Sequence, residues 1–128
     1  MIGKFFEAKK NNQREVQIWG TGHASREFFY VEDAAKDIIT AVEKYDKPEP
    51  LNLGTGDEIT ILDLAKTIAR KVGFEGELVF DIGITDGQPH RCMNIDKARN
   101  EFPLCPKISL EKGLDKTIEW FITTTRER

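Results

Sequence analysis

Hydrophobic residues recur with helical spacing in four parts of the chain. In the clearest, about residues 60–72, Thr60 is a good N-cap for a helix, and Gly73 follows as a C-cap. The apolar positions of this segment fall on one helix face: Ile61, Leu64, Ala65, Ile68 and Val72. The same spacing predicts helices over about residues 2–11, 33–45 and 109–123, the last beginning after Ser109.

The helix predicted over about residues 33–45 is strongly amphipathic. Its apolar face carries Ala35, Ile38, Ile39 and Val42, whereas charged residues such as Asp37 lie outside that face. An apolar stripe on a helix normally packs against a core. We therefore expect the stripe to be buried and Asp37 to face solvent.

Five short segments have the composition of β-strands: residues 16–19, 27–31, 51–54, 77–81 and 91–95. Together with the helices they give the order α β β α β α β β α. There is no internal repeat, low-complexity segment or linker. The sequence therefore predicts one α/β unit with short strands and about four helices.

Composition and charge exclude several classes of protein. The chain has 128 residues, enough for one modest core, and a formal net charge of −3 without a basic block. We therefore expect no nucleic-acid partner. No apolar run is long enough to cross a membrane, and the start, "MIGKFFEAKKNN", has no secretory signal, so we expect a cytoplasmic protein.

The two cysteines do not suggest a disulfide or a redox pair. Cys92 and Cys105 are not in a Cys-x-x-Cys motif, and reduced thiols are the default in the cytoplasm. A metal site built from these cysteines with His90 and His23 is an alternative, but no pair of them has zinc spacing. We expect no metal.

Two Gly-Thr-Gly turns, residues 20–22 and 54–56, begin like a dinucleotide-binding fingerprint. The third glycine of that fingerprint is missing in both, because Ser25 and Ile59 stand there. We therefore expect tight turns that exploit the conformational freedom of glycine, the first of them in a hairpin, and no cofactor bound by either.

Arg26 and the segment "TDGQPHRCMN" (85–94) are the candidates for binding an anion. Arginine offers five donors in a fixed fork that suits phosphate, and the segment places His90 and Arg91 after a turn. The alternatives are a surface ion pair from Arg26 to a nearby carboxylate and a plain solvated turn. No motif for a nucleophile or an acid–base pair is present, so no catalytic residue is predicted.

As a set, four motifs resemble a known family. "VQIWGTGHASREFFYVEDAA", "LNLGTGDEITILDLAKTIARKVGFEGELVFD", "DGQPHRCMNIDKAR" and "ISLEKGLDKTIEWF" resemble, in this order, the C-terminal part of extended short-chain dehydrogenases. These form the NAD-dependent epimerase/dehydratase family, which acts on nucleotide sugars. The nearest likeness is to the GDP-L-fucose synthases, followed by the UDP-glucose 4-epimerases.

The resemblance implies that residues 1–128 are a single C-terminal nucleotide-sugar-binding domain, truncated relative to the family. In the family, a preceding Rossmann domain binds NAD(P) and performs the chemistry with a Tyr-x-x-x-Lys pair. That pair does not occur in these residues, since Ala34 follows Tyr30 by four and Glu49 follows Tyr45 by four. We therefore expect the Rossmann part to be absent, no cofactor to bind this chain alone, and the chain alone to be inactive.

The resemblance also assigns four substrate-binding residues. Trp19 matches a family tryptophan near the substrate, and Arg26 matches the arginine that contacts the diphosphate of the nucleotide sugar. Arg91 matches the second of two basic residues in a substrate loop, and His90 stands where the first is more often permanently charged. The sugar nucleotide is GDP- or UDP-linked.

Other readings of the chain remain open. It is alternatively a stand-alone nucleotide-sugar-binding or interaction module without activity, or a fragment of a longer enzyme. In the fragment reading, the surface that meets the missing Rossmann domain is exposed, and we expect it to include Ile2, Phe5 and Phe6. An exposed apolar patch promotes association, so a homo-oligomer through this surface is expected.

Overall fold

The computed structural model describes residues 1–105 and 107–126. These form five helices and four short strands, which confirms the α/β class. In chain order the elements are α1 (Ile2–Lys10), β1 (Glu15–Trp19), β2 (Ser25–Glu27), α2 (Val31–Lys44), β3 (Glu58–Thr60), α3 (Ile61–Val72), β4 (Glu77–Asp81), α4 (Asp96–Glu101) and α5 (Leu110–Arg126).

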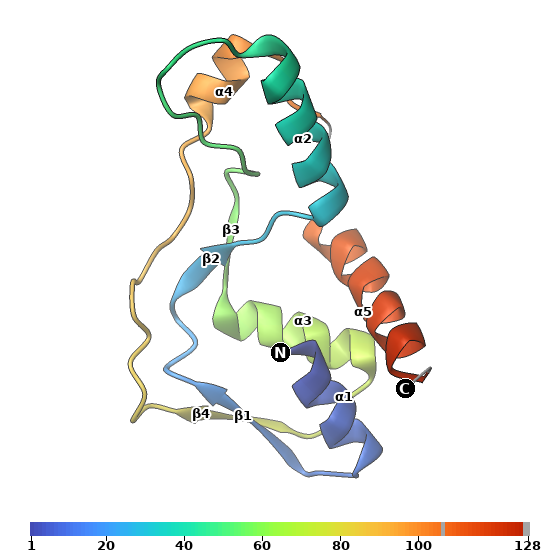
Figure 1. Ribbon diagram of the computed structural model, residues 1–128. Helices are drawn as coiled ribbons and strands as arrows, with labels where there is room; N and C mark the ends of the chain where they lie inside the picture. The colour runs from blue at the N-terminus through green and yellow to red at the C-terminus, as the bar shows by residue number, and fades with distance from the viewer. Residues whose placement is uncertain (106, 127–128) are drawn as a thin grey trace.

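The core lies between a two-stranded parallel sheet and three helices. β1 pairs with β4 in the register Val16 to Leu78 and Ile18 to Phe80. Figure 1 shows α1 and α3 beside this pair, with α5 crossing toward them, while α2 and α4 lie at the other end of the molecule. The buried cluster comes from α1, β1, α3, α5 and the residue Phe74, with Leu78 and Phe80 of β4 packed against it: Phe5, Ala8, Val16, Ile18, Leu64, Ala65, Ile68, Val72, Phe74, Leu114 and Ile118.

Helix α3 forms as its sequence pattern predicts. The Thr60 hydroxyl oxygen accepts a hydrogen bond from the backbone N–H of Asp63 at 3.0 Å, and the hydroxyl donates to the Asp63 carboxylate at 2.7 Å. Gly73 ends the helix in the left-handed conformation, with φ 72°. The predicted apolar positions Leu64, Ile68 and Val72 are buried, so local signals suffice for this element.

The first Gly-Thr-Gly turn does not form a hairpin, contrary to prediction. β1 pairs with β4, and β2 instead pairs antiparallel with β3, so the turn links two separate sheets. The predicted strand 27–31 is also wrong, because β2 ends at Glu27 and Val31 begins α2. The second Gly-Thr-Gly turn lies before β3, and residues 51–54 are not a strand.

The apolar face of α2 is exposed, which contradicts the prediction that it packs on the core. Ile38, Ile39 and Val42 are 54%, 59% and 80% exposed, whereas Asp33 and Asp37 are 1% and 0% exposed. The buried carboxylates are bonded to the segment before α5. Asp33 accepts from the backbone N–H of Ile108 at 2.6 Å.

Asp37 holds the same segment from one helical turn further along. It accepts from the backbone N–H of Cys105 at 2.9 Å and pairs with the ammonium of Lys107. Burial of these charged groups is tolerated because each carboxylate is hydrogen-bonded. The polar face of α2 therefore packs inward and its apolar stripe faces out.

Helix α1 does not provide the exposed apolar patch that its sequence suggested. Phe5 is fully buried and meets Phe74 edge to face, with ring centroids 5.6 Å apart. Phe6 meets Phe121 in the same manner, also at 5.6 Å. Phe5 and Phe6 belong to the core and its margin, and only part of Ile2 reaches the surface.

Residues 1–105 and 107–126 contain neither a membrane-spanning helix nor a cluster of metal ligands. None of their helices is both long enough and apolar enough to span a membrane. Within the same ranges, no group of three or more His, Cys, Asp or Glu side chains is arranged to hold a metal ion.

Candidate functional site

Residues 86–93, called here the 86–93 segment, run beside β2 and bring the predicted site residues together. The backbone N–H of Ser25 donates to the carbonyl of Pro89 at 2.8 Å, and that of Glu27 donates to the carbonyl of Arg91 at 3.1 Å. The strand that the sequence predicts over residues 91–95 does not form. These two hydrogen bonds nevertheless align the 86–93 segment with β2 as a neighbouring strand would be. Arg26, His90 and Arg91 therefore share one edge of the molecule.

The guanidinium of Arg26 binds the 86–93 segment through backbone oxygens. Nη1 donates to the carbonyl of Ser25 at 2.6 Å and to that of Gln88 at 2.8 Å, and Nη2 donates to the carbonyl of Asp86 at 3.2 Å. Within residues 1–105 and 107–126 these bonds use three of the five guanidinium N–H groups, which leaves two for another acceptor. Because carbonyls leave the charge uncompensated, this arginine can still attract an anion.

Arg26 does not form the surface ion pair with Glu27, Glu32 or Asp33 that was the alternative to anion binding. The three candidate carboxylates are engaged elsewhere: Glu27 accepts backbone N–H groups, Asp33 binds Ile108, and Glu32 lies 3.6 Å from the ammonium of Lys116. Arg26 thus combines a structural role in the 86–93 segment with an available positive charge.

His90 contacts two side chains through a single ring nitrogen. Its Nδ1 lies 2.9 Å from the Ser25 hydroxyl and 3.0 Å from a carboxylate oxygen of Glu58 in β3. A serine–histidine–acid triad needs the serine on one ring nitrogen and the acid on the other. This group therefore orients the imidazole and does not activate Ser25 as a nucleophile.

Trp19 lies at the end of β1 with an exposed ring, and sequence reasoning missed the residue beside it. The ammonium of Lys4 in α1 stands 5.5 Å from the centre of the Trp19 ring and donates to the carbonyl of Gln17 at 2.7 Å. Lys4 therefore adds a cation next to the predicted tryptophan. The position of Lys4 in the predicted helix, beside its apolar face, does not indicate a contact with Trp19.

The first Gly-Thr-Gly turn binds a carboxylate of the protein itself. Asp86 accepts hydrogen bonds from the backbone N–H of Thr21 at 2.7 Å and from the Thr21 hydroxyl. These bonds lower the pKa of Asp86. A side chain at Gly20, where φ is 79°, would collide with that carboxylate, so glycine is required here.

The second Gly-Thr-Gly turn is occupied in the same way by Glu27. One oxygen of Glu27 accepts from the backbone N–H of Thr55 and, at 2.9 Å, from that of Gly56; the other accepts from the backbone N–H of Met93 at 2.8 Å. Burial alone would raise the pKa of Glu27, but the bonds from Met93, Gly56 and Thr55 outweigh it and lower the pKa.

These two turns do not fit the diphosphate of NAD(P). A dinucleotide turn presents backbone N–H groups to a phosphate, and here backbone N–H groups of Thr21, Thr55 and Gly56 already face carboxylates. A phosphate would have to displace Asp86 or Glu27 and meet their negative charge. The glycines that resembled a cofactor motif serve instead to admit internal carboxylates.

Neither cysteine has the environment of an activated nucleophile. Burial raises the pKa of both Cys92 and Cys105, and the neighbouring carboxylates of Glu27 and Asp33, respectively, raise it further. A thiolate is the reactive form of cysteine, so these thiols are poor nucleophiles near neutral pH.

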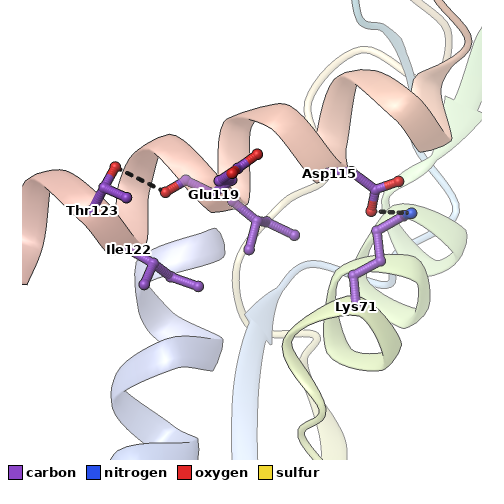
Figure 2. Close-up of a pocket in the computed structure, with 6 residues that line it drawn as sticks. Lys71, Asp115, Glu119, Ile122 and Thr123 are labelled. Atoms are coloured by element: carbon purple, nitrogen blue, oxygen red, sulfur yellow. Dashed lines mark hydrogen bonds and ion pairs between the residues drawn. The ribbon is translucent and has the colours of Figure 1, made fainter.

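Two hollows lie away from the 86–93 segment. The first, of about 360 Å³, lies between α3 and α5. Figure 2 shows its lining residues, among them Lys71, whose ammonium is bonded to Asp115 at 2.6 Å. Because Glu111 also pairs with Lys71, the cation there is already neutralised. The second, of about 860 Å³, is lined by apolar groups of α1, α5 and the β2–α2 connection, among them Phe28, Val31 and Trp120.

A family model and the sequences of known proteins indicate the same family for this chain. Residues 1–54 match the NAD dependent epimerase/dehydratase family. The chain is 40% identical over 122 residues to a probable GDP-L-fucose synthase 1 of Oryza sativa subsp. japonica, covering 95% of this chain and 37% of that protein.

Two solved structures have the same fold. One is a GDP-L-fucose synthetase from Naegleria fowleri bound to NADP, with TM-score 0.91 and 28% identity over 98% of this chain and 39% of that one. The other is a UDP-glucose 4-epimerase with UDP-glucose from Thermotoga maritima, with TM-score 0.81 and 31% identity over 97% of this chain and 40% of that one.

The chain thus spans about two fifths of the length of these proteins. Over that length the sequence and the fold agree with one another. They confirm the resemblance of this chain to the NAD-dependent epimerase/dehydratase family of extended short-chain dehydrogenases, with GDP-L-fucose synthases among its relatives.

Proposed function

We propose that this chain is the nucleotide-sugar-binding part of an NAD(P)-dependent epimerase, dehydratase or reductase of the GDP-L-fucose synthase type. The observation that carries the proposal is the alignment of the 86–93 segment with β2, which gathers Arg26, His90 and Arg91. Relatives named for GDP-L-fucose and a structural neighbour holding UDP-glucose support a sugar nucleotide as the ligand.

In this proposal the basic residues bind the diphosphate that links nucleoside and sugar. Arg26 offers its two remaining N–H donors, and Arg91 offers an exposed side chain. Trp19, at the end of β1 with Lys4 beside it, is the tryptophan that the resemblance assigns to the substrate. The diphosphate is remote from the reacting carbon of the sugar. Its binding energy would orient the sugar for chemistry performed by residues outside this chain.

The chain would bind its ligand but not turn it over. NAD(P) supplies hydride transfer in enzymes that use it, and the two Gly-Thr-Gly turns do not fit that cofactor. The 128 residues also contain no Tyr-x-x-x-Lys pair. Catalysis therefore needs a cofactor-binding domain as partner, which is the Rossmann domain that the family resemblance implies.

The surface that such a domain would cover is the exposed stripe of α2 together with the 860 Å³ hollow next to it. Val31 belongs to both and is 71% exposed, so the two apolar surfaces are continuous. Apolar surfaces of this kind mark interaction sites. Of the three residues expected at the interdomain surface, Ile2 lines this hollow, whereas Phe5 and Phe6 belong to the core and its margin. A homo-oligomer through α2 is the corresponding proposal for the chain on its own.

Isothermal titration calorimetry with GDP-L-fucose and UDP-glucose tests the proposed function. We expect binding of at least one of them and its loss in Arg91→Ala, a residue whose side chain makes no bond that stabilises the fold in the described residues. Lys36→Ala, which removes an exposed cation of α2, is the matched control and should bind normally. Equal affinities of Arg91→Ala and the intact chain would refute the diphosphate site.

The second candidate function is a stand-alone nucleotide-sugar-binding module. It shares the binding site, so calorimetry does not separate the two. The genomic reading frame around the coding sequence does: a frame for a Rossmann domain joined to it favours the enzyme, and a gene without one favours the module. An assay of the isolated chain with NADPH that shows turnover would contradict both.

A further inference from the structure

We propose that Glu58 is a positioning residue that fixes the tautomer of His90, and thereby makes anion binding at His90 dependent on uptake of a proton. The inference rests on the proposed nucleotide-sugar site and specifies how one of its residues works. It starts from the convergence of Glu58 and Ser25 on Nδ1 of His90.

An ionised carboxylate only accepts hydrogen bonds, so Nδ1 must carry the hydrogen that faces Glu58. Ser25 can adapt to this arrangement, because its hydroxyl oxygen accepts while its proton points toward the carbonyl of Pro89, 3.4 Å away. In the neutral imidazole the single hydrogen is then on Nδ1. The other nitrogen, Nε2, carries a lone pair.

Nε2 is the nitrogen that a ligand can reach. The His90 side chain is 76% exposed, whereas Nδ1 is occupied from both β2 and β3. A diphosphate oxygen has no hydrogen to donate, so it is repelled by the Nε2 lone pair and attracted only by an Nε2–H. With Nδ1 held by Glu58, that N–H exists only in the imidazolium, and binding must therefore take up a proton.

The charged surroundings of His90 are consistent with this arrangement. Glu58 faces it from β3, and Arg91 is its neighbour in the chain; Glu27 and Asp57 act electrostatically on the adjacent Cys92. From β2 the contacting group is the uncharged Ser25. A glutamine at position 58 could donate to Nδ1, so Glu58→Gln would allow the tautomer with hydrogen on Nε2, which binds an anion without a proton.

Two measurements on the full chain test the inference. The first is the ¹⁵N chemical shift of both His90 ring nitrogens by NMR at about pH 8.5, where imidazole is neutral. We expect hydrogen on Nδ1 in the intact chain and in Ser25→Ala, and a shift toward Nε2 in Glu58→Gln. Hydrogen on Nε2 in the intact chain would overturn the inference.

The second is calorimetry with GDP-L-fucose and UDP-glucose in two buffers of different ionisation enthalpy, which gives the number of protons taken up. We expect proton uptake on binding by the intact chain, less in Glu58→Gln and none from this site in His90→Gln. Binding with equal proton uptake in all three proteins would refute the role of Glu58 and leave the proposed function intact. Absence of binding heat with both ligands would refute the proposed function, and with it the proton-coupled step.

Discussion

Replacing Glu27 with glutamine removes a charge from the point where three segments of the chain meet. Glu27 binds the second Gly-Thr-Gly turn through one oxygen and the 86–93 segment through the other. Glutamine can keep its carbonyl oxygen toward Thr55 and Gly56. Its amide group must then face the backbone N–H of Met93, so that two donors oppose each other.

The size of the effect follows from these bonds. One hydrogen bond to a charged acceptor is lost, which is worth about 1.5–3 kcal/mol, and the bonds that remain lose their charge assistance. We expect the free energy of unfolding to fall by about 2–4 kcal/mol, out of the ~5–15 kcal/mol typical of a domain. With a denaturant slope of about 2 kcal/mol/M, the middle of the usual range for urea, the midpoint should fall by about 1–2 M.

The pH dependence provides an independent check. The folded-state pKa of Glu27 is lowered from its ordinary value of 4.5. Its contribution to stability is therefore fully present above that value and is lost as the pH falls through the lower folded-state pKa. The Glu27→Gln protein should lose this part of the acid dependence.

Urea unfolding followed by circular dichroism, repeated from neutral to acid pH, measures both effects. Glu119→Gln is the matched control, because Glu119 is an exposed residue of α5 at the hollow between α3 and α5, and its change should leave the midpoint in place. A loss below about 1 kcal/mol in Glu27→Gln, or an acid dependence identical to that of the intact chain, would show that Glu27 does not join the three segments.

Three further changes probe other parts of the structure. Asp37→Asn leaves the half-buried Lys107 without its carboxylate and should lower the free energy of unfolding by about 2–4 kcal/mol in urea, whereas Lys36→Gln on the exposed side of α2 should not; a loss near zero would contradict the buried pair. Gly20→Ala combines a positive φ with a collision at Asp86 and should cost at least about 1–2 kcal/mol, whereas Gly3→Ala in α1, which meets Phe121 at an ordinary 3.4 Å, should be neutral or stabilising; equal stabilities would refute the reading of the turn. Ile38→Lys with Val42→Lys should abolish self-association of the chain in sedimentation velocity, and an intact chain that is monomeric at high concentration would argue against the homo-oligomer.

Local sequence signals predicted some elements well. α3 combines a regular apolar spacing with Thr60 and Gly73 as caps, and these act within a few residues of one another. β1 and β4 were predicted because each is a short run of residues that favour strands, bounded by polar residues and too short for a helix. β3 and α4 were missed, since Glu58–Thr60 and Asp96–Glu101 are too short and too polar to carry a periodic signal.

The site was predicted in part. Arg26, His90 and Arg91 were chosen from a turn, a loop and a family resemblance, and the structure brings these three to one edge. Their ligand role stays a prediction, as does that of Trp19, which lies on the other sheet beside Lys4. Lys4 and Glu58 were not found, because each contacts the site from an element distant in sequence.

The sequence by itself determined four of the five helical segments of the described residues, where α3 begins and ends, and that both Gly-Thr-Gly runs are turns. These properties depend on the backbone preferences and hydrophobic spacing of neighbouring residues. The tertiary structure alone decided which face of α2 is buried, because Asp33 and Asp37 meet bonding partners some 70 residues away. It also decided what the turns hold, since carboxylates from distant segments occupy the N–H groups that a phosphate would need.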